Sequence, residues 1–102
     1  MINIYIKVIR MISKSQAIQT LFKNASQEVH NINTKPNDSE LLELYAYYKQ
    51  GTVGDVNTEK PSFFMFKDSA KWNAWNELKG MSKLQAQVNY IKIVEGLKAK
   101  YN

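Results

Sequence analysis

Two phenol rings and one ammonium, grouped on one short segment, form the part of the sequence best suited to chemistry. Tyr48 and Lys49 follow Tyr45 by three and four residues, respectively. Residues at these spacings share one face of a helix, so the three side chains would lie in the same small volume. A planar base can stack on a tyrosine ring, and a phosphate can bind an ammonium and a hydroxyl. The alternative is that both tyrosines are core residues whose hydroxyls reach water.

Side chains for catalysis and for metal binding are scarce. The 102 residues include no cysteine and a single histidine, His30. Disulfides, thiolate metal sites and cysteine nucleophiles are therefore excluded, and a histidine-based metal site or a catalytic triad within the chain is not expected. No credible pair of nucleophile and base remains, so we expect neither an enzyme nor a metal site.

The positive charge is concentrated near the N-terminus. The formal net charge is +5. Residues 1–27 contain four basic residues and no acidic residue, which gives +4, whereas residues 28–102 contain ten lysines and nine acidic residues, which gives +1. The second segment therefore lacks the broad basic surface that duplex DNA or RNA requires. A few placed lysines could still hold a small phosphorylated ligand.

Residues 1–16 are predicted to be an N-terminal extension, disordered or a targeting tail, and residues 17–102 to be one domain. Apolar residues alternate in a strand-like way at the start of the chain, but no partner strand is evident. The stretch is too short and too polar to span a bilayer, and no secretory cleavage site follows it. Its basic, acid-free composition suggests an organelle presequence, and the alternative is an upstream extension with translation starting at Met11.

Four amphipathic helices are expected in the domain, because apolar residues recur at spacings of three and four. The expected helices cover about residues 17–31, 38–50, 68–79 and 83–101. Asn37 with Glu40, and Ser82 with Gln85, have the spacing of capping boxes at the starts of the second and fourth helices. Glycines at positions 51 and 54 are expected to end the second helix.

The connection between the second and third helices is unusually long. It runs over residues 52–65, and loops of this length inside a compact domain are often functional. Its second half is aromatic, with Phe63 and Phe64 followed by Phe66 at the start of the next segment. These rings could pack the loop onto the domain or line an apolar groove. We expect packing for at least one of them.

Four blocks of the sequence resemble the acyl-CoA-binding proteins. The blocks are Leu44–Gln50, Thr52–Asn57, Lys71–Gly80 and Tyr90–Ile91, in the order and spacing of that family, and the similarity covers about residues 22–101. The resemblance implies an all-α fold, a four-helix up-down bundle of the acyl-CoA-binding protein type. It also implies non-covalent binding of one long-chain fatty acyl-CoA ester, with no cofactor and no chemical step.

The resemblance also implies which residues bind the ligand. Lys49 and Lys71 would hold the phosphates, with the Tyr45 hydroxyl as a further donor. Tyr48 would stack on or flank the adenine, and Tyr90 would contact the nucleotide or the pantetheine end. The complete set of predicted ligand-binding residues is Phe22, Ser26, His30, Tyr45, Tyr48, Lys49, Lys67, Lys71 and Tyr90.

Two positions and one segment depart from the family pattern. The family usually has lysine at the position of His30, and a small alanine or serine at the position of Gly51. The segment Ser62–Met65 is bulkier and more aromatic than is usual. These departures bear on head-group affinity and on the preferred acyl chain length, and not on the fold.

The expected function is that of an intracellular carrier and pool former for medium- to long-chain acyl-CoA esters in lipid metabolism. We expect a cytoplasmic monomer with no nucleic-acid partner and with transient membrane contact, and we leave organelle targeting by the basic tail open. Two alternatives would not bind acyl-CoA. One is a helical protein-interaction module, and the other is a single-stranded nucleic-acid binder that stacks bases on the tyrosines.

Overall fold

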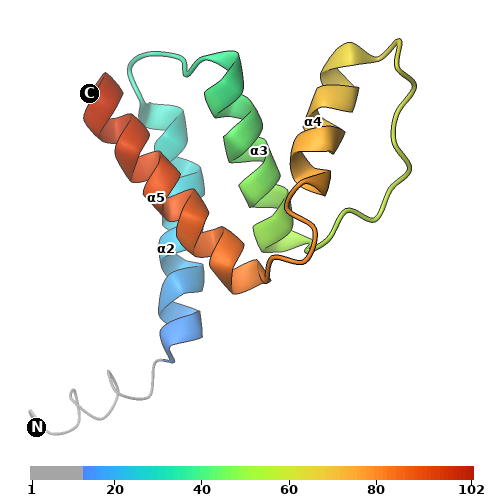
Figure 1. The fold of residues 1–102 in the computed structure, drawn as a ribbon. Coiled ribbons are helices and arrows are strands. Elements are labelled where there is room, and N and C mark those ends of the chain that lie inside the picture. Colours follow the sequence, from blue (N-terminus) through green and yellow to red (C-terminus); the bar gives the residue numbers. More distant parts are fainter. Residues whose placement is uncertain (1–12) are drawn as a thin grey trace, which may run out of the picture.

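The computed structural model describes residues 13–102, and this part of the chain is all-α and contains no strand (Figure 1). Its elements are α2 (Lys14–Glu28), the 3₁₀-helix η1 (Val29–Asn31), α3 (Asp38–Thr52), α4 (Phe66–Asn76) and α5 (Lys83–Tyr101). The predicted all-α, four-helix fold is confirmed. The expectations for residues 1–12 lie outside the described residues, and the division of the chain at residue 16 stays a prediction.

Reciprocal side-chain caps fix the starts of three helices. The Glu40 backbone N–H donates to Asn37 Oδ1 over 2.9 Å, and the Asn37 backbone N–H donates to Glu40 Oε1 over 2.9 Å. This predicted capping box and the one at Ser82 are both confirmed. A third box, at Ser13, was not predicted, and it starts α2 three residues before the expected residue 17. Each box satisfies backbone N–H groups that a helix start would otherwise leave unpaired.

The prediction that Gly51 ends α3 was wrong, because α3 continues through it to Thr52. A Cβ atom at Gly51 would lie only 3.1 Å from Cζ of Phe22 and 3.2 Å from Cγ of Gln87. The absence of a Cβ atom at Gly51 therefore allows side chains of α2 and α5 to pack closely against α3. The turn after α3 uses Gly54, whose φ of +94° lies in the left-handed region that favours glycine.

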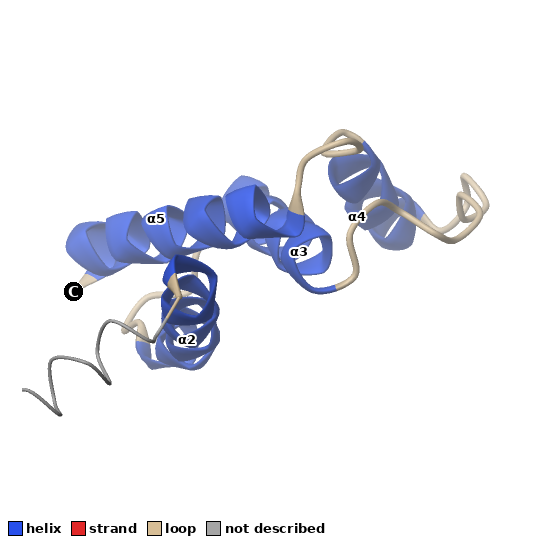
Figure 2. Ribbon diagram, turned by 90° about the horizontal axis from the view of Figure 1, so that it is seen from below, coloured by secondary structure: helices blue, strands red, loops and turns tan. Residues whose placement is uncertain are grey.

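α5 and α3 form the central pair of helices in the fold. α5 packs against both α2 and α3, whereas α4 packs against α3 (Figure 1). Viewed from below, α4 lies at the end of the molecule away from α2 (Figure 2). The core joins Tyr90, Val94 and Leu97 of α5 to Phe22 of α2 and Leu44 of α3. None of the helices within residues 13–102 has the length and apolar character needed to cross a membrane.

The long connection over residues 53–65 makes α3 and α4 run in the same direction, which interrupts the up-down alternation between these two helices (Figure 1). Two tryptophans of α4 donate hydrogen bonds to this connection. The indole N–H of Trp75 donates to the Gly54 carbonyl over 2.8 Å, and that of Trp72 donates to the Thr58 carbonyl over 3.0 Å. These two hydrogen bonds therefore attach the first half of the connection to the side of α4.

Asp55 joins the start of this connection to the end of α3 and to the turn between α4 and α5. Its carboxylate accepts hydrogen bonds from the Gly80 backbone N–H over 2.8 Å and from Gln50 Nε2 over 2.9 Å. Because these donors favour the ionised form, they hold the pKa of Asp55 below its ordinary value. Gln50 is fully buried, and its Nε2 also donates to the Met81 carbonyl over 2.8 Å.

Glu40 joins the start of α3 to the end of α5. Its carboxylate accepts hydrogen bonds from the Tyr101 hydroxyl over 2.6 Å and from Lys100 Nζ over 3.0 Å, in addition to the capping bond from Asn37. The Tyr101 hydroxyl, then the Asn37 N–H and then Lys100 lower the pKa of Glu40 to about 2. The ionised carboxylate therefore stabilises the contact between the two helices.

Stability should depend on pH through Glu40. Its pKa in the folded protein lies below its ordinary value of 4.5, so its contribution is complete above that value and is lost as pH falls towards 2. Glu40→Gln should therefore reduce the fall in melting temperature between about pH 5 and pH 2.5. Glu43→Gln, at an exposed position on the same helix, is the control. Equal slopes for wild type and Glu40→Gln in circular-dichroism melts would contradict this role.

Candidate functional site

A cavity of about 660 Å³ lies between two parts of the chain. One side is formed by the C-terminal half of α2, η1 and the loop that follows, and the other side is formed by α3. The volume of the cavity is in the usual range for small-molecule sites. Apolar residues from both sides line it, among them Val29, Ile32 and Leu44. Five of the predicted site residues also line it, namely Ser26, His30, Tyr45, Tyr48 and Tyr90.

Three aromatic rings pack together at one end of this cavity, and two of them, Tyr48 and Tyr90, line it. The ring centres of Phe22 and Tyr90 are 5.1 Å apart, those of Phe22 and Tyr48 are 5.6 Å apart, and those of Tyr48 and Tyr90 are 5.9 Å apart. Tyr48 is 41% exposed, whereas Phe22 and Tyr90 are buried. Phe22 does not line the cavity and instead supports the two tyrosines from behind. The exposed ring of Tyr48 is the surface on which a planar group can stack.

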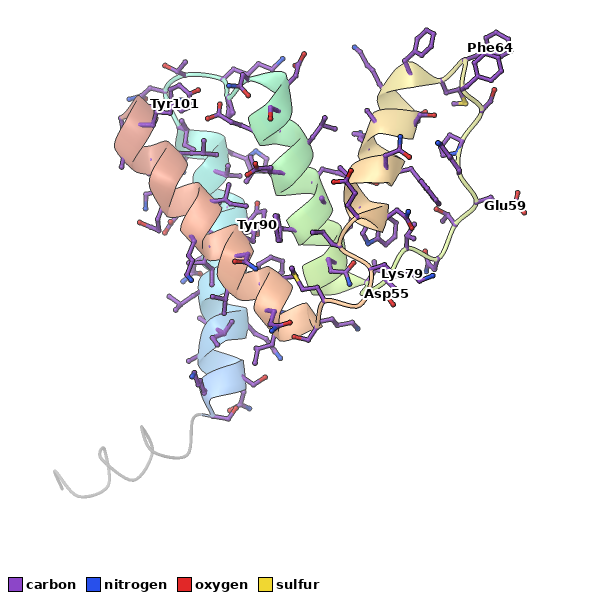
Figure 3. The ribbon with its side chains drawn as sticks, in the orientation of Figure 1. Asp55, Glu59, Phe64, Lys79, Tyr90 and Tyr101 are labelled. Atoms are coloured by element: carbon purple, nitrogen blue, oxygen red, sulfur yellow. The ribbon has the colours of Figure 1, made fainter. Side chains whose placement is uncertain are left out.

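Tyr90 supplies a neutral hydrogen-bond donor to the cavity. It is the residue of α5 that lines the cavity, and it is labelled on that helix in Figure 3. Burial, and next the neighbouring Tyr48 phenol, raise the pKa of Tyr90 to about 12. The phenol therefore keeps its proton at neutral pH and can donate to a phosphate or carbonyl oxygen.

A groove of about 420 Å³ between α3 and α4 adjoins the cavity, since Lys35 and Leu41 line both. Its walls are apolar apart from three lysines and Asp38, and they include two predicted site residues, Lys67 and Lys71. Lys71 Nζ lies 5.1 Å from the centre of the Tyr45 ring, which lines the cavity. This contact places an ammonium at the junction of cavity and groove.

Lys49 lines neither the cavity nor the groove. Its Nζ lies 4.9 Å from the centre of the Trp75 ring, a cation–π contact that joins α3 to α4. Lys49 follows Tyr48 directly and lies one helical turn after Tyr45, so it stands at the edge of the site. The structure therefore brings seven of the nine predicted residues to the cavity and groove, and leaves Phe22 and Lys49 outside their linings.

The lysines of this site have no carboxylate partner within residues 13–102. The ion pairs in this part of the chain belong to Lys98 and Lys100. Lys35, Lys67 and Lys71 therefore remain available to a negatively charged ligand, which can form charge-assisted hydrogen bonds with them. Sequence reasoning missed Lys35, although its place before Pro36 predicts an extended backbone in the loop between α2 and α3.

The comparison with known proteins agrees with this geometry. Residues 19–94 match the model of a family described as acyl CoA binding protein. The chain belongs to the acyl-CoA-binding protein family. Two relatives are the acyl-CoA-binding protein of Saccharomyces cerevisiae, 49% identical over 83% of this chain and 98% of the relative, and the acyl-CoA-binding protein homolog 1 of Caenorhabditis elegans, 51% identical over 78% of this chain and 93% of the relative.

Solved structures of this family have the same fold. The crystal structure of Oryza sativa acyl-CoA-binding protein 2 matches 84% of this chain and 94% of its own, with a TM-score of 0.81 at 35% identity. The solution structure of the yeast acyl-coenzyme A binding protein matches 79% of this chain and 94% of its own, with a TM-score of 0.66 at 52% identity. The bundle described above is therefore the acyl-CoA-binding protein fold, and the ligand contacts of individual residues stay predictions.

Proposed function

We propose that the protein binds medium- to long-chain acyl-CoA esters without reacting with them and serves as an acyl-CoA carrier and pool former in lipid metabolism. The observation that carries this proposal is the junction of a ring-lined cavity with an apolar groove, marked by lysines that have no carboxylate partner in the described part of the chain. A ligand with a planar base, several phosphates and an apolar chain is complementary to that combination. Family membership supports the same ligand.

The cavity and the groove would bind different parts of the ligand. The adenine would stack on the exposed ring of Tyr48 in the cavity, with Tyr90 as a hydrogen-bond donor. Lys35 and Lys71 lie where the spaces meet, so they would hold the phosphates. The acyl chain would extend along the apolar groove, past Leu42 and Ala70. Burial of methylenes there adds affinity with each carbon that the groove can cover.

The proposal involves a monomer in the cytoplasm, without cofactor and without a catalytic step. The near-neutral charge of residues 28–102 supports a small phosphorylated ligand over nucleic acid, whose binding needs a broad basic surface. Acyl-CoA is the ligand, and the contact with membranes is transient. A carrier needs reversible binding, and hydrogen bonds, stacking and apolar burial supply that without any covalent intermediate.

Calorimetric titration tests the proposal. Palmitoyl-CoA should bind far more tightly than palmitate, because the fatty acid lacks the phosphates and the adenine. Affinity should rise with acyl length, by at most about 0.8 kcal/mol for each buried methylene. Free CoA, which lacks the acyl chain, should bind more weakly than palmitoyl-CoA. Equal affinities for palmitate and palmitoyl-CoA would contradict the proposed roles of the lysines.

His30 should influence binding of the head group. It lines the cavity one helical turn beyond Ser26, where the family usually has lysine. A permanent ammonium at this position could form a charge-assisted hydrogen bond with a phosphate of the ligand. His30→Lys should therefore bind palmitoyl-CoA at least as tightly as wild type does at pH 8.

His30→Ala is the comparison variant. It removes a hydrogen-bonding side chain from the cavity, so it should bind palmitoyl-CoA more weakly than wild type. Equal Kd values for wild type, His30→Lys and His30→Ala in calorimetry would show that His30 takes no part in binding the head group.

A further inference from the structure

Four consecutive large apolar residues project from the end of the long connection into solvent. Phe63, Phe64, Met65 and Phe66 are 70%, 74%, 51% and 75% exposed, respectively. Phe64 lies at an outer corner of the molecule, where the connection enters α4 (Figure 3). We call these four residues the aromatic tip. Single exposed apolar residues are ordinary in soluble proteins, whereas a contiguous exposed group marks a binding surface. The expectation that at least one of these rings packs the loop down is not met.

A hydrogen-bonded backbone turn shapes the aromatic tip. The Met65 N–H donates to the Ser62 carbonyl over 2.9 Å, and the Ser69 hydroxyl donates to the same carbonyl over 3.2 Å. The centres of the Phe63 and Phe64 rings are 4.1 Å apart. The two rings therefore cover each other in part but remain open to solvent on their outer sides. A preformed backbone turn loses less conformational entropy than a flexible loop when its side chains enter an apolar phase.

The charges beside the aromatic tip suit the surface of an anionic bilayer. Residues 61–66 carry no charge, and Lys60 and Lys67, both exposed, flank this run directly. The acids Glu59 and Asp68 lie one residue further out, and Lys71 lies a turn beyond them, so residues 59–71 carry a net charge of +1 from three lysines and two acids. An apolar projection flanked by lysines places its rings at the hydrocarbon boundary and its ammonium groups among lipid phosphates.

The aromatic tip is continuous with the proposed acyl-chain groove. Phe66 belongs to both, and the neighbouring Lys67 also lines the groove. Insertion of the tip would therefore bring the mouth of the groove to the level of the lipid head groups. A long-chain acyl-CoA is itself an amphiphile that partitions into bilayers by its acyl chain. The groove would then face the place where the ligand is held before capture.

We propose that the aromatic tip docks on an anionic phospholipid bilayer by inserting Phe63 and Phe64 into its surface, with Lys60 and Lys67 contacting the head groups. Docking orients the groove towards the bilayer, so that the acyl chain passes between lipid and protein with little exposure to water. Docking of the aromatic tip does not require a bound ligand, whereas transfer of the acyl chain from the bilayer to the groove rests on the proposed function.

A single label on the full-length chain tests docking at this position. The chain has no cysteine, so Phe64→Cys provides one unique site for a polarity-sensitive fluorophore. Its emission should shift to shorter wavelength on addition of vesicles of phosphatidylcholine with phosphatidylserine, and less with phosphatidylcholine alone. The control is Leu21→Cys, at a 53% exposed leucine of α2, and its emission should not shift. A site-specific label is needed because the N-terminal segment 1–12 is itself apolar and basic and could bind vesicles. No shift at position 64, or equal shifts at both positions, would overturn the proposal.

Removal of the two rings provides the second test. Phe63→Ser/Phe64→Ser should lower the vesicle partition coefficient about tenfold or more, since it removes two side chains of apolar surface. Leu21→Ser is the matched control and should partition like wild type. In vesicle-free calorimetry the double variant should bind palmitoyl-CoA as wild type does. Docking without any binding of palmitoyl-CoA would support the docking step and contradict the proposed function.

Two results would assign the aromatic tip to another partner and overturn the proposal. In the first, the double variant binds palmitoyl-CoA more weakly but partitions into vesicles normally, which would mean that the tip covers the acyl chain. In the second, wild type sediments as a dimer that the double variant cannot form, and vesicle partition is unchanged. The tip would then be an interface between two copies of the chain.

Discussion

Lys71→Ala should weaken the binding of palmitoyl-CoA by about 1.5–3 kcal/mol, the range for hydrogen bonds to charged groups. Lys71 lines the groove at its junction with the cavity, where its Nζ lies over the Tyr45 ring and has no carboxylate partner within residues 13–102. A phosphate placed there would gain a direct contact with the ammonium. The loss corresponds to about a tenfold to a hundredfold rise in Kd.

Calorimetry at fixed salt concentration measures this effect, with circular dichroism as a check on folding. Lys92→Ala is the matched control, because Lys92 is an exposed lysine of α5 that is not a predicted site residue and lines neither the cavity nor the groove. The family resemblance assigns Lys49 to the phosphates as well, so Lys49→Ala is predicted to fall in the same range, although Lys49 lines neither space and contacts Trp75 in the free protein. An unchanged Kd for Lys71→Ala, with wild-type helicity, would remove Lys71 from the phosphate site.

Trp75→Ala should destabilise the fold by about 3–5 kcal/mol, the cost of removing a buried large aromatic side chain. Trp75 is only 3% exposed, and it holds three parts of the protein together. Its ring belongs to α4, its indole N–H binds the Gly54 carbonyl at the start of the long connection, and Lys49 of α3 covers its face. A loss of this size is a large part of the stability of a small domain.

Urea unfolding followed by circular dichroism measures this loss. Trp75→Phe should cost less, because it keeps a ring in the core while the hydrogen bond to Gly54 is lost. Trp72→Ala is the comparison on the same helix, since Trp72 is less buried and also donates one hydrogen bond to the connection. A loss of less than about 1 kcal/mol for Trp75→Ala would show that α4 contributes little to the cooperative fold.

Local sequence signals predicted the helices well, because caps and apolar periodicity act within a few residues. The boxes at Asn37 and Ser82 depend on partners three residues away and are confirmed. Gly51 shows the limit of local reasoning. The sequence favours a helix end there, but the reason for glycine is the close approach of Phe22 from another helix. Such a contact is set by tertiary packing, which no spacing along the chain encodes.

The site residues also fall into two groups, those that local periodicity places together and those that tertiary packing brings together. Tyr45 and Tyr48 share a face of one helix, so periodicity alone placed them together. Lys67 and Lys71 reach the groove only because the long connection returns the chain to the level of the start of α3 and sets α4 parallel to it. The aromatic tip was misjudged for a related reason. Aromatic residues are buried on average, but burial of Phe63 and Phe64 would need a neighbouring surface, and the connection ends at a corner of the fold.

The place of α5 at the end of the described chain bears on how the protein is made. α2 and α3 both pack on α5, so Phe22 and Leu44 lack most of their core partners until residues 83–101 have left the ribosome. The core therefore cannot form stepwise from its N-terminal side, and the apolar faces of α2 and α3 stay open to chaperones until α5 has emerged. Because the core joins α2 to α5, its formation must close a loop that contains most of residues 13–102.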